Sequence, residues 1–121
     1  MKKILLSVTA FIAVQAACAQ LPAFEWAKNM GDIFASIVAR STVVDASGNV
    51  YSTGDFGGTV DFDPGPGTFY LTSGTNNAAF ILKLDAAGNF VWAKNMANGS
   101  SPFSYSIVLD ATGNVLATGT F

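Results

Sequence analysis

Histidine is absent from the 121 residues of this chain, and cysteine occurs only once. Without histidine, Ser-His-Asp and Cys-His nucleophile systems are excluded, and the usual nitrogen ligands of zinc are missing. The one cysteine, Cys18, lies near the N-terminus, so the rest of the chain has no disulfide. Charged residues make up only 12% of the chain, whereas hydrophobic residues make up 50%. Stability is therefore expected to come from an apolar core and from repetition.

The N-terminus has the three parts of an export signal. Lys2 and Lys3 precede an apolar run over residues 4–14, and small residues follow at Ala17 and Ala19. The apolar run is too short to span a bilayer, which takes about 20 residues. The pattern predicts a signal peptide over residues 1–19 and a mature chain over residues 20–121.

Lipidation at Cys18 is the alternative for this segment. Small residues precede the cysteine, but Gln15 stands where a lipobox usually has leucine. With either form of processing, we expect the mature protein to be secreted or held at the outer cell surface.

The mature chain is predicted to be acidic. Cleavage removes Lys2 and Lys3 and leaves four basic residues against eight acidic ones, a net charge of −4. Nucleic acid and anionic lipid are therefore not expected as partners.

The sequence repeats itself. The string WAKNM occurs at residues 26–30 and again at 92–96, a displacement of 66 positions. VVDASGNVYSTGDF at 43–56 returns as VLDATGNVLATGTF at 108–121, a displacement of 65. Self-similarity at a fixed period indicates a repeat architecture. We predict one full repeat of about 65 residues and a partial second within residues 20–121.

Within each period the hydrophobic pattern is typical of β-strands. Phe80, Leu82 and Leu84 alternate onto one face, and residues 90, 92, 94 and 96 (Phe, Trp, Lys, Met) are expected on one face of the next strand. No mature segment has a long helical periodicity, so the fold class is predicted as all-β. Further strands are predicted at residues 35–45, 50–56, 59–63, 69–73, 106–110 and 115–121.

Three short motifs of the form Asp-x-x-Gly-Asn separate these strands. Each places Asp where a type I turn begins and Gly where the chain then needs a positive φ, which is the chemistry of a tight antiparallel hairpin. Calcium ligation by these aspartates is the alternative, but each copy lacks further nearby acids. The structural turns are Asp45 with Gly48, Asp85 with Gly88, and Asp110 with Gly113.

Four antiparallel strands per period, with an inserted hairpin, are typical of a propeller blade. The sequence pattern places the insertion between the fourth strand of one unit and the first strand of the next. Stacking of β units in a solenoid is the alternative. Because propellers usually have four to eight blades, the chain is expected to be an incomplete β-propeller that needs neighbouring repeats to bury its faces.

The insertion contains the best candidate for a site, TVDFDPGPGTF at residues 59–69. On an extended strand Asp61 and Asp63 share one face, about 6.6 Å apart at Cα. With Asp55 or backbone carbonyls they form a candidate calcium site. An EF-hand frame counted from Asp61 fails, because Pro66 and Thr72 stand where that frame needs Gly and Glu.

Two alternatives exist for the same carboxylates. As an acid and base pair, Asp61 and Asp63 have a separation near that of inverting glycosidases. As turn residues, they sit on a solvated face, Pro64-Gly65 forms the centre of a type II turn, and Asp63 accepts hydrogen bonds from turn N–H groups. The turn interpretation fits the local chemistry best, and no catalytic residue is assigned.

Trp26 and Trp92 also have two interpretations. In a secreted protein they are candidate platforms for stacking sugars. Because both stand in the identical string WAKNM, we expect them to pack between blades, with Lys28 and Lys94 covering the indoles.

FILKLDAAGNFVWAKNM, followed by SIVLDATGNVLATGTF, resembles the bacterial SBBP (seven-bladed β-propeller) repeats of exported proteins. The insertion GTVDFDPGPGTFYLTSG resembles a version common in large proteins that end in a type IX secretion sorting domain. The family has no general catalytic residue set, so the resemblance implies a non-enzymatic module. This chain departs from the family in having too few repeats to close a ring and no sorting domain.

Two functions follow as hypotheses. The first is an exported structural or interaction module whose loops meet a protein or a polysaccharide. The second is an accessory carbohydrate-binding domain of a secreted polysaccharide-degrading enzyme. Neither requires a cofactor, apart from the calcium considered above.

Overall fold

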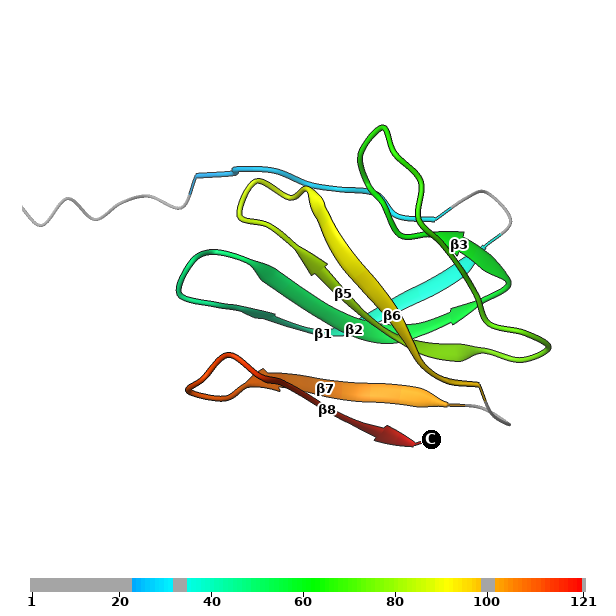
Figure 1. The fold of residues 1–121 in the computed structure, drawn as a ribbon. Coiled ribbons are helices and arrows are strands. Elements are labelled where there is room, and N and C mark those ends of the chain that lie inside the picture. Colours follow the sequence, from blue (N-terminus) through cyan, green and yellow to red (C-terminus); the bar gives the residue numbers. More distant parts are fainter. Residues whose placement is uncertain (1–22, 32–34, 99–101, 121) are drawn as a thin grey trace, which may run out of the picture.

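A computed structural model describes residues 23–31, 35–98 and 102–120, and every regular element in these ranges is a β-strand (Figure 1). This confirms the all-β prediction. No helix in the described ranges is long and apolar enough to cross a membrane. The strands are β1 (Ser36–Val44), β2 (Val50–Gly57), β3 (Thr59–Asp61), β4 (Tyr70–Thr72), β5 (Ala78–Leu84), β6 (Phe90–Asn98), β7 (Phe103–Leu109) and β8 (Val115–Thr120).

Four of these strands form one antiparallel sheet in the order β1-β2-β5-β6. β3 pairs only with β4, and β7 pairs with β8, as separate two-stranded ribbons among the described residues. The β3–β4 ribbon therefore leaves from the middle of the sheet, between β2 and β5. The prediction that it lies between two units is wrong. The reason is that β2 forms an antiparallel pair with β5, from Val50↔Leu84 to Phe56↔Ala78.

The β7–β8 hairpin repeats the geometry of β1–β2. β1 has one extra residue, Arg40, as a bulge where its pairing with Gly54 and Thr53 of β2 shifts. β7 has the same irregularity at Tyr105, 65 positions later. Glycine is needed at position 54 because a Cβ there would collide with the backbone carbonyl of Val38. The repeat in the sequence is thus also a repeat in the structure.

One face of the four-stranded sheet, here called the core face, carries the hydrophobic core. Phe80, Leu82 and Leu84 are buried on it, as their alternation predicts. The β3–β4 ribbon folds over this face and contributes Val60 and Phe62, both fully buried. The ring of Phe62 lies 4.9 Å from that of Phe80, between centroids. Each such side chain contributes about 1.5–3 kcal/mol on full burial. Residues 59–72, which comprise β3, β4 and the loop between them and are here called the excursion, are therefore part of the core.

The prediction for β6 is wrong in one respect. Leu84 pairs with Phe90 and Lys83 pairs with Trp92, so Val91 is an extra, bulged residue. The bulge turns Phe90 toward the core face, where it packs against the cluster, and leaves Trp92 on the opposite face. Phe90 and Trp92 therefore do not share a face.

The opposite face of the sheet, here called the stacking face, receives the second hairpin. β7 lies against β1 and β2 and reaches β5 (Figure 1). The buried hydroxyls of Thr53 and Ser104 are 2.6 Å apart, and Ser41 Oγ accepts a hydrogen bond from Ile107 N at 3.3 Å. Two successive repeats thus stack face to face, as in a partial β-propeller.

Candidate functional site

The three Asp-x-x-Gly-Asn motifs form hairpin corners with one shared geometry. At the first corner, Asp45 Oδ1 accepts hydrogen bonds from Ser47 N and Asn49 N, both at 2.9 Å. Its Oδ2 accepts a third from Asn49 Nδ2 at 2.8 Å. Gly48 has a φ of +84°, as the turn chemistry predicts. Both carboxylate oxygens of Asp45 therefore stabilise the turn that the motif forms.

The other two corners repeat this pattern. Asp85 accepts hydrogen bonds from Ala87 N and from the backbone and side chain of Asn89. Asp110 accepts the equivalent bonds from Thr112 and Asn114, with an additional one from the hydroxyl of Thr112. The matching glycines, Gly88 and Gly113, have φ angles of +78° and +85°.

These hydrogen bonds stabilise the charged form of each carboxylate. Those from the side chain and backbone of Asn114, with those from Thr112, lower the pKa of Asp110 from 3.8 to about 2. The side chain of Asn49 and the backbone of Asn89 are the main causes that lower the pKa of Asp45 and Asp85. A general acid needs a raised pKa, so none of the three is suited to donate a proton near neutral pH.

All three corners lie at the same end of the molecule, on the left in Figure 1. Because their carboxylates are turned to their own backbone, the side chains that remain for outside contacts are small and neutral. We call this end the corner surface and define it by residues 45–49, 85–89 and 110–114. A hollow of about 580 Å³ separates the first and third corners and is lined by both.

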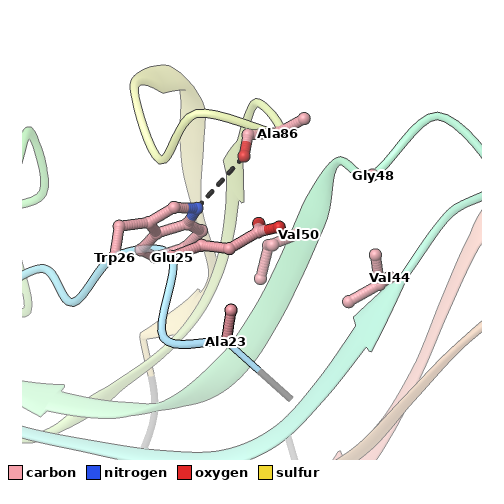
Figure 2. A pocket seen from close by; sticks show the side chains of 7 residues that line it. All are labelled: Ala23, Glu25, Trp26, Val44, Gly48, Val50 and Ala86. Carbon is pink, nitrogen blue, oxygen red and sulfur yellow. Dashed lines mark hydrogen bonds between the residues drawn. The ribbon is translucent and has the colours of Figure 1, made fainter. Parts of the chain in front are cut away.

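A second hollow, of about 400 Å³, lies on the other side of the first corner. Figure 2 shows Trp26 and Glu25 beside it, with the indole Nε1 of Trp26 donating a hydrogen bond to Ala86 O at 3.1 Å. Val44 and Val50 are among the residues that line it. The site therefore combines one aromatic ring, one carboxylate and apolar side chains.

The aspartates of the excursion accept hydrogen bonds from backbone N–H groups. Asp61 Oδ1 accepts hydrogen bonds from Asp63 N at 3.0 Å and Phe69 N at 2.8 Å. Asp63 Oδ1 accepts one from Gly65 N at 2.7 Å. The turn interpretation placed these roles on Asp63 alone, whereas Asp61 holds both sides of the loop together.

The predicted type II turn at Pro64-Gly65 is wrong, because Gly65 does not have a positive φ. The glycines have another purpose. A Cβ on Gly67 would collide with the carboxylate of Asp63, and one on Gly65 would lie 3.0 Å from it. The loop uses glycine to let its backbone approach this carboxylate.

Asp55 belongs to a different part of the molecule. Its buried carboxylate pairs with Arg40, with 2.6 Å between Arg40 Nε and Asp55 Oδ1. The guanidinium also lies 5.4 Å from the ring centroid of Phe103 in the next hairpin. Sequence reasoning missed this pair, although the glycine in TGDF was a signal of the bulge that positions Arg40.

Within the described residues, no group of three or more Asp, Glu, His or Cys side chains is placed to hold a metal ion. The structure thus does not bring Asp55, Asp61 and Asp63 together as one such group, and calcium binding at Asp61 and Asp63 stays a prediction. The predicted signal peptide and Cys18 lie outside the described residues.

One relative supports the fold. Over 71 residues, 58% of this chain, the sequence is 35% identical to an uncharacterized WD repeat-containing protein, L264, of Acanthamoeba polyphaga mimivirus. The matched region is 5% of that relative's length. No family model and no solved structure matches the chain. The fold and this similarity point to a propeller-type repeat module, and no catalytic family is indicated.

Proposed function

We propose that this chain is an exported, non-enzymatic propeller-repeat segment that acts as an interaction module at the outer cell surface or outside the cell. The observation that carries this proposal is the corner surface, where three carboxylates accept hydrogen bonds from the backbone of their own turns. An end built this way is rigid, and its three aspartates are not suited to act as general acids. The resemblance to bacterial SBBP repeats and the signal-like N-terminus support the exported location.

Recognition would come from shape and from the variable residue of each corner. The third position of the motif is Ser47 in the first corner, Ala87 in the second and Thr112 in the third. The turns hold these positions at fixed places, so the corner residues lose little conformational entropy when a partner binds. The net charge of −4 predicted for the mature chain favours a neutral or basic protein, or a polysaccharide, as that partner.

Site-specific photocrosslinking on cells tests this role. A photoreactive residue at position 47 or 112 of the full chain should give adducts, whereas the same residue at Tyr70, which is exposed on the excursion, should give none. Mass spectrometry of the exported protein should find an N-terminus at Gln20. Retention of the chain in the cytoplasm, or equal adducts at all three positions, would contradict the proposal.

The hollow beside Trp26 favours a second function, an accessory carbohydrate-binding domain of a secreted polysaccharide-degrading enzyme. An aromatic ring next to a carboxylate is a common arrangement for holding a sugar ring by stacking and hydrogen bonding. Affinity electrophoresis in polysaccharide gels distinguishes the two functions. Carbohydrate binding predicts retardation that Trp26→Ala removes and Trp92→Ala preserves, and equal mobility with and without polysaccharide would exclude it.

A further inference from the structure

Glu25 differs from the other acidic residues that the structure describes. All the described aspartates accept a hydrogen bond or an ion pair from within the fold: Asp45, Asp55, Asp61, Asp63, Asp85 and Asp110. Across residues 23–31, 35–98 and 102–120, no donor or cation pairs with the carboxylate of Glu25, which is exposed. This carboxylate is therefore available to a group from outside the chain.

The carboxylate borders the hollow of about 400 Å³ beside the ring of Trp26 (Figure 2). The ring is fixed from two sides. Its Nε1 donates a hydrogen bond to Ala86 O, and a Cβ placed on Gly88 would lie only 2.9 Å from its Cδ2. Because the indole is already held in place, it loses little conformational entropy when a ligand meets it.

The described lining of this hollow carries negative charge and no positive charge. Beside Glu25 it consists of apolar side chains and glycine: Ala23, Trp26, Val44, Gly48, Val50 and Ala86. Lys28 is close along the chain but forms no ion pair with Glu25 in the part of the chain that the structure describes. Hydrogen bonds from Asn89 lower the pKa of Asp85, and the charge of Lys28 adds to that lowering. The hollow therefore favours a cation.

The surroundings of Glu25 suit an organic cation better than a metal ion. Calcium takes six to eight oxygen ligands, whereas the side chains of the described lining supply a single carboxylate. An aromatic ring attracts a cation held close to it, and apolar side chains can cover the carbon stem that bears the charge. Trp26 supplies the ring, and Val44 and Val50 supply apolar surface.

The chain itself shows how such a pair of groups holds a guanidinium. Arg40 Nε lies 2.6 Å from Asp55 Oδ1, and Arg40 Cζ lies 5.4 Å from the ring centroid of Phe103. A guanidinium suits this arrangement because it is planar, weakly hydrated and able to stack on aromatic rings. Glu25 and Trp26 offer the same two groups, a carboxylate beside an aromatic ring.

The hollow also lies directly beside the corner surface. A Cβ placed on Gly48 would lie 3.0 Å from the Cβ of Ala86, so the first and second corners meet at its edge. Ser47 and Ala87, the variable positions of these two corners, are the adjacent residues in the sequence. A protein that contacts both positions would therefore also reach the hollow.

We propose that the hollow beside Glu25 and Trp26 binds an arginine side chain of the protein that meets the corner surface. The guanidinium pairs with the carboxylate and lies against the indole, as Arg40 does with Asp55 and Phe103. This inference rests on the proposed role as an interaction module, and it assigns the hollow to a protein in place of the carbohydrate of the second function. The acidity predicted for the mature chain agrees with a basic partner.

An NMR titration of the isotope-labelled full chain with a short peptide tests the proposal. The probe is acetyl-Gly-Arg-Gly-amide at about 1–10 mM, because one exposed charge pair binds weakly. The indole N–H of Trp26 and the amides of Gly48 and Ala86 should shift, whereas the indole N–H of Trp92 should not. The same peptide with citrulline, which is neutral but similar in shape, should bind at least about fivefold more weakly.

Two variants of the chain test the role of the carboxylate. Glu25→Gln should weaken binding of the arginine peptide at least about fivefold and leave the melting temperature unchanged, because the described residues make no use of this carboxylate. Asp63→Asn removes an equal charge from the excursion and should preserve the affinity. Unchanged affinity in Glu25→Gln, or equal binding of the citrulline peptide, would overturn the proposal.

The results also separate this inference from the function on which it rests. Adducts at position 47 on cells, combined with no response to the arginine peptide, would overturn the arginine site and leave the interaction module in place. Arginine binding that depends on Glu25, without adducts at position 47 or 112, would support the site and contradict the module. Retardation by a neutral polysaccharide that Trp26→Ala removes, with no response to arginine, would overturn the inference in favour of the carbohydrate function.

Discussion

At the scale of single residues, Gly54 and Gly119 fix the geometry of the repeat. Each lies opposite a bulge, where a Cβ would collide with the carbonyl of Val38 or of Phe103. This is the same steric requirement at the same place in two successive hairpins. It explains why both β2 and β8 have glycine at this position, 65 residues apart in the sequence.

Gly54→Ala is therefore expected to destabilise the protein strongly. Because the obstacle is backbone, the added methyl should cost about 3 kcal/mol or more, which lowers the melting temperature by roughly 10 °C or more in a domain of this size. Gly57→Ala is the control, since its Cβ would meet the end of the Asn77 side chain, which can rotate. Thermal melts that show equal losses for the two variants would contradict the bulge geometry.

The ion pair of Arg40 and Asp55 gives a second prediction at this scale. Asp55 is only 4% exposed, so Arg40→Ala leaves a buried carboxylate without its cation. We expect a loss of about 1–3 kcal/mol in the free energy of unfolding, reduced from the fully buried case because Arg40 is partly exposed.

The chain itself offers the matched control for this pair. The second repeat has Tyr105 and Thr120 at the positions of Arg40 and Asp55. The double variant Arg40→Tyr with Asp55→Thr should lose less stability in chemical denaturation than Arg40→Ala alone. A double variant that is less stable than the single one would show that the buried charge is not the cause.

At the scale of elements, the corner of β7 and β8 should depend on pH. The pKa of Asp110 is lowered to about 2, so its stabilising hydrogen bonds are complete above its ordinary value of 3.8 and are lost as the pH falls toward 2. NMR titration of the Thr112 and Asn114 amides should show a transition in this range that is absent in Asp110→Asn. A midpoint at or above 3.8 would contradict the hydrogen bonds described for this corner.

The excursion between β3 and β4 is expected to be held by Asp61 without a metal. Asp61→Ala leaves the amides of Asp63 and Phe69 without their acceptor and should cost about 1–2 kcal/mol in the presence of a chelator. The same melts test the calcium hypothesis. A rise in melting temperature with calcium, abolished by Asp61→Asn with Asp63→Asn, would establish that site in place of the turn alone.

The sequence predicted the elements well where the signal was local. The corners at Asp45, Asp85 and Asp110 were predicted from turn chemistry that lies within five residues. The alternation of Phe80 with its neighbours gave the buried face of β5. These features depend on contacts between near neighbours, which a pattern of residue types records directly.

Features that depend on pairing between distant strands were not predictable in the same way. The bulge at Val91 changes the face of Trp92, and the apolar run FVWA at residues 90–93 has no turn or glycine signal that marks it. Gly65 looked like a turn residue, but the reason for it is the nearby carboxylate of Asp63. Arg40 meets Asp55 only because two strands pair in one register. Such contacts are set by the assembled sheet.

At the scale of the whole molecule, the period of the repeat was clear but the order of strands in the sheet was not. A repeat of about 65 residues can be divided at any of its loops, and the sequence pattern predicts the boundary at the longest one. The structure divides it between β6 and β7 instead, with the excursion folded onto the core face. Burial of Val60 and Phe62 explains this choice, because the ribbon completes the core of its own unit.

The central claim is that two successive repeats stack face to face through the stacking face of the first sheet. The most direct measurement is a nuclear Overhauser effect between the side chains of Thr53 and Ser104 in the isotope-labelled full chain, whose hydroxyls lie 2.6 Å apart. We predict this effect, together with one between Ser41 and the amide of Ile107. A folded first sheet that shows neither effect, with β7 and β8 moving independently of it, would contradict the stacking of the repeats.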